Sequence, residues 1–332
     1  TLGCSRMATA DNSLASPAET SSAADVVIDV SGSGFASIQD EWVAEPGVSE
    51  LCLMFNAIER IEKLDGLTSL RKLNLRANRI AEIGGLGSLS QLAELELYEN
   101  RIERIEGLEG LEALTMLDVS FNRIGKIEGL EGAGLASLQQ LFLANNSISE
   151  LGGLANLPAL RLLELGSNQI RTVPCLKHLR RLEELHLGRN KINSLAGLAG
   201  LPALRVLGVA SNRLRSLEGI EGLETLREVY ADHNGIDSMG TLVRLERLHT
   251  LDLSANRLAA IECASLASLE ELWLNTNPIA TLSDVAQLST LPVLKTIYLE
   301  GCPVSKLADY RQALLRLAPR LQQLDADMIP QS

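Results

Sequence analysis

The feature that most constrains this chain is the pattern L-x-x-L-x-L-x-x-N-x-I, which recurs about every 22 residues. Residues 160–170 hold a clear copy, with leucine at 160, 163 and 165, asparagine at 168 and isoleucine at 170. The asparagine recurs as Asn56, Asn78, Asn100, Asn122, Asn146, Asn168, Asn190, Asn212, Asn234, Asn256 and Asn277, and Cys302 takes the same place in the last copy. A chain made of such units builds no central core, because each unit packs mainly on its two neighbours.

Each unit predicts one short strand and one return segment. In L-x-L the leucines point inward and their neighbours outward, which is the period of a strand. The asparagine is expected to turn inward and bond the backbone of adjacent turns, since buried polar groups need partners. The segment I-x-x-I-x-G-L-x-x-L should cross the opposite side as short helical or 3-10 turns. The sequence therefore predicts an α/β leucine-rich repeat solenoid with a curved, parallel concave sheet and 12–13 repeats.

The repeat pattern also predicts the boundaries. Residues 1–24 are rich in Ser, Ala and Thr without periodicity, so we expect a disordered tail. Residues 25–306 form the solenoid, whose degenerate first repeat serves as the N-terminal cap, with Trp42 and Val43 packed over it. Residues 307–332 form a C-terminal cap, with a helix over 310–319 and a strand over 321–325. Two extra residues before Asn146 predict a bulge in 131–134 on the outer face.

Composition narrows the class of protein. A net charge of −12 and a pI near 5.0 argue against nucleic-acid binding, which requires a basic stripe. No apolar run of 18 residues and no signal peptide occur, so we expect neither a membrane span nor secretion. The five cysteines form no C-x-x-C pair and the histidines show no metal-ligand spacing, which predicts a reducing compartment, no metal and no cofactor.

No enzyme motif occurs in the sequence. Phosphate-binding, dinucleotide-binding, serine-hydrolase and zinc-protease patterns are all missing. Asp252 and Glu271 resemble a general acid and base, but we expect them on an open strand surface with no nucleophile. The sequence therefore predicts a protein that is not an enzyme.

One outward position on each strand, between the two core leucines, should face the concave side. Read in order, these residues are Asp29, Cys52, Asn74, Glu96, Asp118, Phe142, Glu164, His186, Gly208, Tyr230, Asp252, Trp273 and Tyr298. We call this row the central column. Solvent-facing strand positions tolerate almost any residue, yet four of the ten aromatic residues of the chain fall in this row. Flanking positions add Glu94, Glu184, Asp232, Glu271 and Glu300. Exposed aromatic residues among acids favour an interface.

The length of the column decides the kind of partner. From Asp118 to Tyr298 is eight strand spacings, roughly 40 Å at about 4.8 Å each. A small molecule does not span that distance, whereas a folded protein does. The acids predict that this partner presents lysine and arginine.

The repeat and four local strings resemble the family of protein phosphatase 1 regulatory subunit 7. The strings are LDVSFN (117–122), LELGSN (163–168), ELWL (271–274) and IYLE (297–300), and Tyr310, Leu321, Leu324 and Asp325 resemble the family's C-terminal cap. The resemblance covers about residues 26–327 and implies a non-catalytic subunit that binds the catalytic subunit of protein phosphatase 1 through its concave face. It implies contacts from Asp118, Phe142, Glu164, Asp252, Glu271, Trp273 and Tyr298. His186 stands where the family has phenylalanine.

The central column adds His186 and Tyr230 to the residues that the resemblance implies. The predicted partner-binding set is therefore Asp118, Phe142, Glu164, His186, Tyr230, Asp252, Glu271, Trp273 and Tyr298. We expect a monomer before binding, located in the nucleus and cytoplasm. One alternative is a leucine-rich scaffold for a cytoskeletal, axonemal or spliceosomal partner. Another is a secreted adhesion protein of the internalin kind, against which the free cysteines and the missing signal peptide count.

Overall fold

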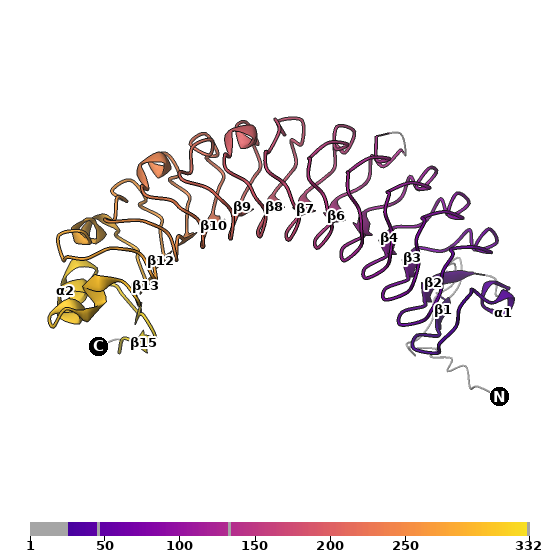
Figure 1. The fold of residues 1–332 in the computed structure, drawn as a ribbon, viewed down its shortest axis with the longest axis horizontal. Coiled ribbons are helices and arrows are strands. Elements are labelled where there is room, and N and C mark those ends of the chain that lie inside the picture. The colour runs from indigo at the N-terminus through magenta and orange to yellow at the C-terminus, as the bar shows by residue number, and fades with distance from the viewer. Residues whose placement is uncertain (1–25, 45–46, 132–133, 331–332) are drawn as a thin grey trace, which may run out of the picture.

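The computed structural model describes residues 26–44, 47–131 and 134–330. The expected tail over 1–24 lies outside these residues, and so do positions 132 and 133 of the expected bulge. Figure 1 shows an arch whose inner side is lined by strands and whose outer side carries loops and short helical turns.

A single sheet runs the length of the arch in the order β1 to β15. Its strands are β1 (Val26–Asp29), β2 (Val48–Cys52), β3 (Lys72–Asn74), β4 (Glu94–Glu96), β5 (Met116–Asp118), β6 (Gln140–Phe142), β7 (Leu162–Glu164), β8 (Glu184–His186), β9 (Val206–Gly208), β10 (Glu228–Tyr230), β11 (Thr250–Asp252), β12 (Glu271–Trp273), β13 (Thr296–Tyr298), β14 (Gln323–Leu324) and β15 (Asp327–Met328). Strands β1 to β14 pair in parallel, and β15 pairs antiparallel with β14. The predicted solenoid, with one strand per repeat, is confirmed.

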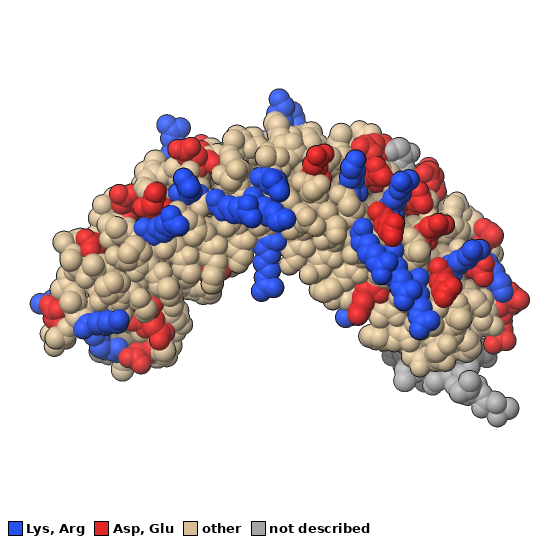
Figure 2. Space-filling model, viewed as in Figure 1, with Lys and Arg blue, Asp and Glu red and all other residues tan. Residues whose placement is uncertain are grey.

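The core is aliphatic, as the repeat predicts. In the unit at 160–170, the side chains of Leu160, Leu163, Leu165 and Ile170 are all fully buried. The return segments contain 3-10 turns in four places, η1 (Ala196–Leu198), η2 (Gly240–Leu242), η3 (Ala286–Thr290) and η4 (Pro303–Lys306). Other described return segments cross as turns without a regular helix. Charged side chains spread over the outer side and along the edge that faces the viewer (Figure 2).

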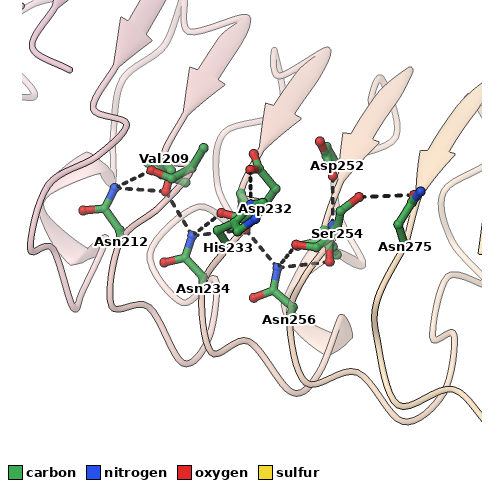
Figure 3. Close-up of polar contacts among 12 residues, drawn as sticks. Val209, Asn212, Asp232, His233, Asn234, Asp252, Ser254, Asn256 and Asn275 are labelled. Carbon is green, nitrogen blue, oxygen red and sulfur yellow. Dashed lines mark hydrogen bonds and ion pairs between the residues drawn. The ribbon is translucent and has the colours of Figure 1, made fainter. Parts of the chain in front are cut away.

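The asparagine of each repeat ties its own turn of the chain to the preceding turn. The Nδ2 group of Asn190 donates to the carbonyl oxygens of Leu165 at 2.9 Å and Leu187 at 3.0 Å, and its Oδ1 accepts from the Ile170 N–H at 3.0 Å. Asn212, Asn234 and Asn256 repeat this arrangement in successive turns (Figure 3). The predicted asparagine ladder is confirmed. In the last copy the Cys302 Sγ lies 3.1 Å from the Leu274 carbonyl oxygen and 3.4 Å from the Asn277 nitrogen.

The residue before each asparagine adopts a left-handed backbone. The φ angle at this position lies between +51° and +59° in every repeat that has the asparagine, for example at Phe55, Ala77, Glu99 and Phe121. Non-glycine residues adopt this conformation at a cost of roughly 1–2 kcal/mol. The bend it makes turns the chain off the strand and brings the asparagine inward. On the outer side, position 129 (φ +81°) requires glycine, because an added Cβ would lie 1.9 Å from the Ile105 carbonyl oxygen.

Both ends of the core are covered. Helix α1 (Asp40–Val43) buries Trp42, whose ring meets Phe35 edge-on at 4.8 Å, as expected for an N-terminal cap residue. Helix α2 (Tyr310–Leu317) buries Tyr310, Ala313 and Leu314. Its Tyr310 hydroxyl donates to Asp325 at 2.8 Å, and the same carboxylate accepts the Leu299 N–H at 2.6 Å. Asp325 thus links the helix to the last repeat.

Replacement of Asn190 by alanine tests the ladder. Asn190→Ala leaves the Ile170 N–H without its acceptor and removes one of the two asparagine donors to each of the Leu165 and Leu187 carbonyl oxygens. We therefore expect the free energy of unfolding to fall by about 1–3 kcal/mol. Urea denaturation measures this change. Asn193→Ala is the control, because Asn193 is exposed on the same turn and should change stability by less than about 0.5 kcal/mol. Equal stability of the two variants would contradict the ladder as a source of stability.

Candidate functional site

The strand register brings the central column into one row. Asp118 pairs with Phe142, Phe142 with Glu164, and Glu164 with His186. Further along, Gly208 pairs with Tyr230, Tyr230 with Asp252, Asp252 with Trp273, and Trp273 with Tyr298. All nine predicted partner-binding residues therefore lie along the concave face, eight of them in the column. Glu271 lies two residues before Trp273, in the neighbouring row.

Three acids of the column fold back onto their own backbone. The carboxylates of Asp118 and Asp252 each accept the N–H two residues further on at 2.8 Å, and that of Glu164 does so at 2.6 Å. Asn74 caps the Arg76 N–H in the same way at 3.1 Å. Asp252 is only 8% exposed, which corrects the expectation of an open, solvent-facing carboxylate. These acids thus have a structural part as well as a charge on the concave face.

Burial disfavours the charged form of these carboxyl groups. Desolvation raises the pKa of Asp118, Glu164 and Asp252 above the ordinary values, and the backbone N–H bond partly opposes that rise. At Glu164 the neighbouring His186 also lowers the pKa. A cationic partner would favour the charged forms and so oppose this rise in pKa.

The aromatic residues cluster towards the C-terminal end of the column. The Trp273 and Tyr298 rings meet edge-on with centroids 6.0 Å apart, and the Tyr298 hydroxyl accepts a short hydrogen bond from Gln323 Nε2. The Trp273 indole N–H is buried and has no acceptor within the described residues. Tyr230 donates its hydroxyl to Glu228 at 2.8 Å, and burial together with this carboxylate raises the Tyr230 pKa to about 12. Tyr230 is therefore a neutral donor at physiological pH.

A hollow of about 550 Å³ opens in the middle of the concave face. It forms because small residues (Gly166, Gly188 and Ala210) occupy the position where earlier repeats carry Arg76 and Tyr98. Its polar lining includes Glu164, His186, Arg189, Tyr230, Asp232 and His233. The His233 Nδ1 lies 2.7 Å from the Asp232 carboxylate (Figure 3), and the His186 Nε2 lies 3.5 Å from Glu184. The hollow has room for a projecting side chain of another molecule.

The sequence interpretation missed a second group of aromatic residues. Arg76 lies with its guanidinium carbon 4.3 Å from the Tyr98 ring centroid and 5.9 Å from that of Phe55. The Tyr98 and Phe121 rings lie 4.7 Å apart. These side chains come from positions beyond the strand, two and three residues after the central column, so the period-2 pattern did not include them.

Two further expectations concern metals and membranes. Over the described ranges, no three His, Cys, Asp or Glu side chains come together in a way that could hold a metal ion. Nor does any helix of those ranges have the length and apolar character that a membrane span requires.

Comparison with known proteins identifies the class. Residues 52–167 match the family described as "Leucine-rich repeat", and residues 180–223 match "Leucine Rich repeats (2 copies)". An internalin of Listeria monocytogenes has a TM-score of 0.65 at 23% identity, covering 92% of this chain and 88% of its own. The functional domain of InlJ from the same organism has a TM-score of 0.68 at 20% identity, covering 90% and 62%. This protein is a leucine-rich repeat protein.

More particular matches are two regulatory subunits of protein phosphatase 1. SDS22 of Schizosaccharomyces pombe is 38% identical over 72 residues, which is 21% of this chain and 22% of that protein. The subunit pprA of Dictyostelium discoideum is 36% identical over 64 residues, 19% of each chain. The matches thus span about a fifth of these relatives' length. They confirm the resemblance to phosphatase regulatory subunits that the sequence strings indicate.

The buried carboxyl of Asp252 gives a test based on pH. Because its pKa is higher in the folded than in the unfolded chain, ionised Asp252 destabilises the fold above the folded pKa, and the cost disappears as pH falls towards the unfolded value. Asp252→Asn keeps an acceptor for the Ser254 N–H, as Asn74 does for Arg76. We expect Asp252→Asn to unfold at a higher temperature than the wild type at pH 7, and the difference to shrink between pH 7 and pH 4. A lower melting temperature at pH 7 would contradict this account.

Proposed function

We propose that this protein is a non-catalytic regulatory subunit that binds the catalytic subunit of protein phosphatase 1 through its concave face. The observation that carries the proposal is the row of acids and aromatic rings from Asp118 on β5 to Tyr298 on β13, which is interrupted at Gly208. Its similarity to SDS22 and pprA supports the choice of partner. We place the protein in the cytoplasm and nucleus, as a monomer before binding.

The C-terminal end of the row has the properties of an energetic centre. Trp273 and Tyr298 are half-buried aromatic residues, and Glu271 beside them makes no ion pair within the described residues. An unpaired buried N–H, such as that of the Trp273 indole, costs about 1–3 kcal/mol. A ring rotation that lets a partner carbonyl accept this proton would remove the cost on binding. Tryptophan and tyrosine are also the residues most enriched at interface hot spots.

A scaffold for another intracellular partner, such as a cytoskeletal, axonemal or spliceosomal protein, is the second candidate. The observation that favours it is the fold itself, because a leucine-rich repeat solenoid offers a concave face to many unrelated proteins. Binding of purified phosphatase catalytic subunit separates the two proposals.

Removal of the aromatic and acidic side chains at this centre tests the proposal. Glu271→Ala combined with Trp273→Ala should weaken binding of the purified catalytic subunit by about 3 kcal/mol or more, roughly a hundredfold in Kd. Biolayer interferometry measures the Kd, and thermal melting checks that the variant folds. The control is Glu246→Ala with Arg247→Ala, an acidic and a basic residue exposed on the outer side. Full binding by the Glu271/Trp273 variant would exclude this site.

A substitution that fills the hollow gives another test of the proposal. Ala210 lines it, so Ala210→Trp should occupy the space that a partner side chain or loop enters and should weaken binding at least tenfold. Ala210→Ser adds only one oxygen atom and serves as the matched control. The same interferometry measures both. If Ala210→Trp folds and binds like the wild type, the partner does not enter the middle of the groove.

A further inference from the structure

A second surface lies on the edge of the arch where strands β2 to β5 end. Its centre is the stack of Phe55, Arg76, Tyr98 and Phe121, which crosses four successive repeats. Phe55 is 57% exposed and Phe121 is 44% exposed, the most exposed aromatic residues of the described chain. Four repeats span about 14 Å at the usual strand spacing. That is the length of four or five residues of an extended peptide.

The backbone conformation makes these two phenylalanines unusual. Both occupy the left-handed position before the slot asparagine, with φ of +54° and +55°. Bulky side chains are rare in this region, where asparagine, aspartate and glycine are favoured. Exposure of a large ring gains nothing for the fold. The contacts of these rings with Arg76 and Tyr98 leave both rings exposed, whereas contact with a partner would cover them.

A row of arginines runs beside the stack. Arg79, Arg101 and Arg123 directly follow the slot asparagines of the three repeats that carry Arg76, Tyr98 and Phe121. Their backbone N–H groups bond Ile58, Ile80 and Ile102 in regular order at 2.8–2.9 Å, which fixes the row. All three are exposed, and within the described residues their guanidinium groups form no hydrogen bond or ion pair. Figure 2 shows a line of basic side chains on this half of the molecule.

The charge of this edge is opposite to that of the protein. Residues 54–57, 76–79, 98–101 and 120–123 contain four arginines and one acid, Glu99, in a chain of net charge −12. Two acids of the adjacent strands, Glu96 and Asp118, already have hydrogen-bond partners. Glu96 accepts from Asn74 at 2.6 Å and lies 3.4 Å from Lys72, and Asp118 accepts from the Ser120 N–H.

We infer that this edge is a docking site for a short, extended, acidic segment of a partner protein that also carries an aromatic or aliphatic side chain. The apolar side chain lies against Phe55, Tyr98 and Phe121. The carboxylates pair with Arg79, Arg101 and Arg123, whose planar N–H groups match carboxylate geometry. Arg76, whose guanidinium carbon lies 4.3 Å from the Tyr98 ring centroid, supplies a further donor. The site lies beside the central column and does not depend on the phosphatase proposal.

Peptide selection with the full chain tests the inference. Ten-residue peptides displayed on phage are selected against the wild-type protein, and the most enriched one is synthesised with a fluorescein label. We expect enriched peptides to be acidic and to contain Phe, Tyr, Trp, Leu or Ile. Fluorescence anisotropy should show at least tenfold weaker binding to Arg79→Glu with Arg101→Glu, and to Phe55→Ser with Phe121→Ser. Thermal melting confirms that both variants fold.

The matched control is Arg213→Glu with Arg257→Glu, which reverses charge at the same repeat position beyond the aromatic stack. It should leave peptide binding within about twofold of the wild type. Three results would overturn the inference. These are selection of basic peptides, equal loss in the control variant, and tighter binding of a labelled fifteen-nucleotide oligouridine than of the peptide.

Discussion

The structure depends on the asparagine that follows each strand. A single amide side chain satisfies the carbonyl groups of its own turn and of the preceding turn, and accepts an N–H from that turn. These backbone groups lie inside a stack where water cannot reach them, so each would otherwise be a buried, unpaired polar group. The left-handed residue before the asparagine is a local cost of this arrangement. The in-register parallel pairing of the strands then aligns the rows on the concave face.

Cys302 shows how far the position tolerates change. A thiol replaces the amide in the last repeat, where the C-terminal cap takes over part of the bonding. There the Asp325 carboxylate accepts the Leu299 N–H, whose equivalents in earlier repeats bond a backbone carbonyl oxygen of the next strand, and Tyr310 holds that carboxylate in place. Burial raises the pKa of the Cys302 thiol, which keeps it neutral and suited to the interior. The ladder therefore ends where a different set of side chains completes it.

The sequence alone predicted the fold and the order of the central column, because a 22-residue period leaves one register for the strands. Asp118, Glu164 and Asp252 were predicted on the right face. The hydrogen bonds that their carboxylates accept from the N–H two residues further on were not predicted. Period 2 gives the direction of a Cβ, and it does not give the rotation of the side chain. The Phe55–Arg76–Tyr98–Phe121 stack was missed for another reason. It joins two different positions of successive repeats, and no count along one position shows it. The part played by either surface in binding is a proposal that rests on chemistry rather than on periodicity.

The regular pairing of β1 to β13 has a consequence for any partner of the concave face. Successive column residues lie one strand spacing apart, about 4.8 Å, so the side chains of the concave face repeat at a fixed interval. A partner that slid along the arch by one repeat would meet an entirely different sequence of side chains, for example Glu164 where it had met Phe142. Intermediate positions align with no row at all. The similar backbone of the repeats thus offers equivalent binding positions, and only the order of the side chains selects one of them.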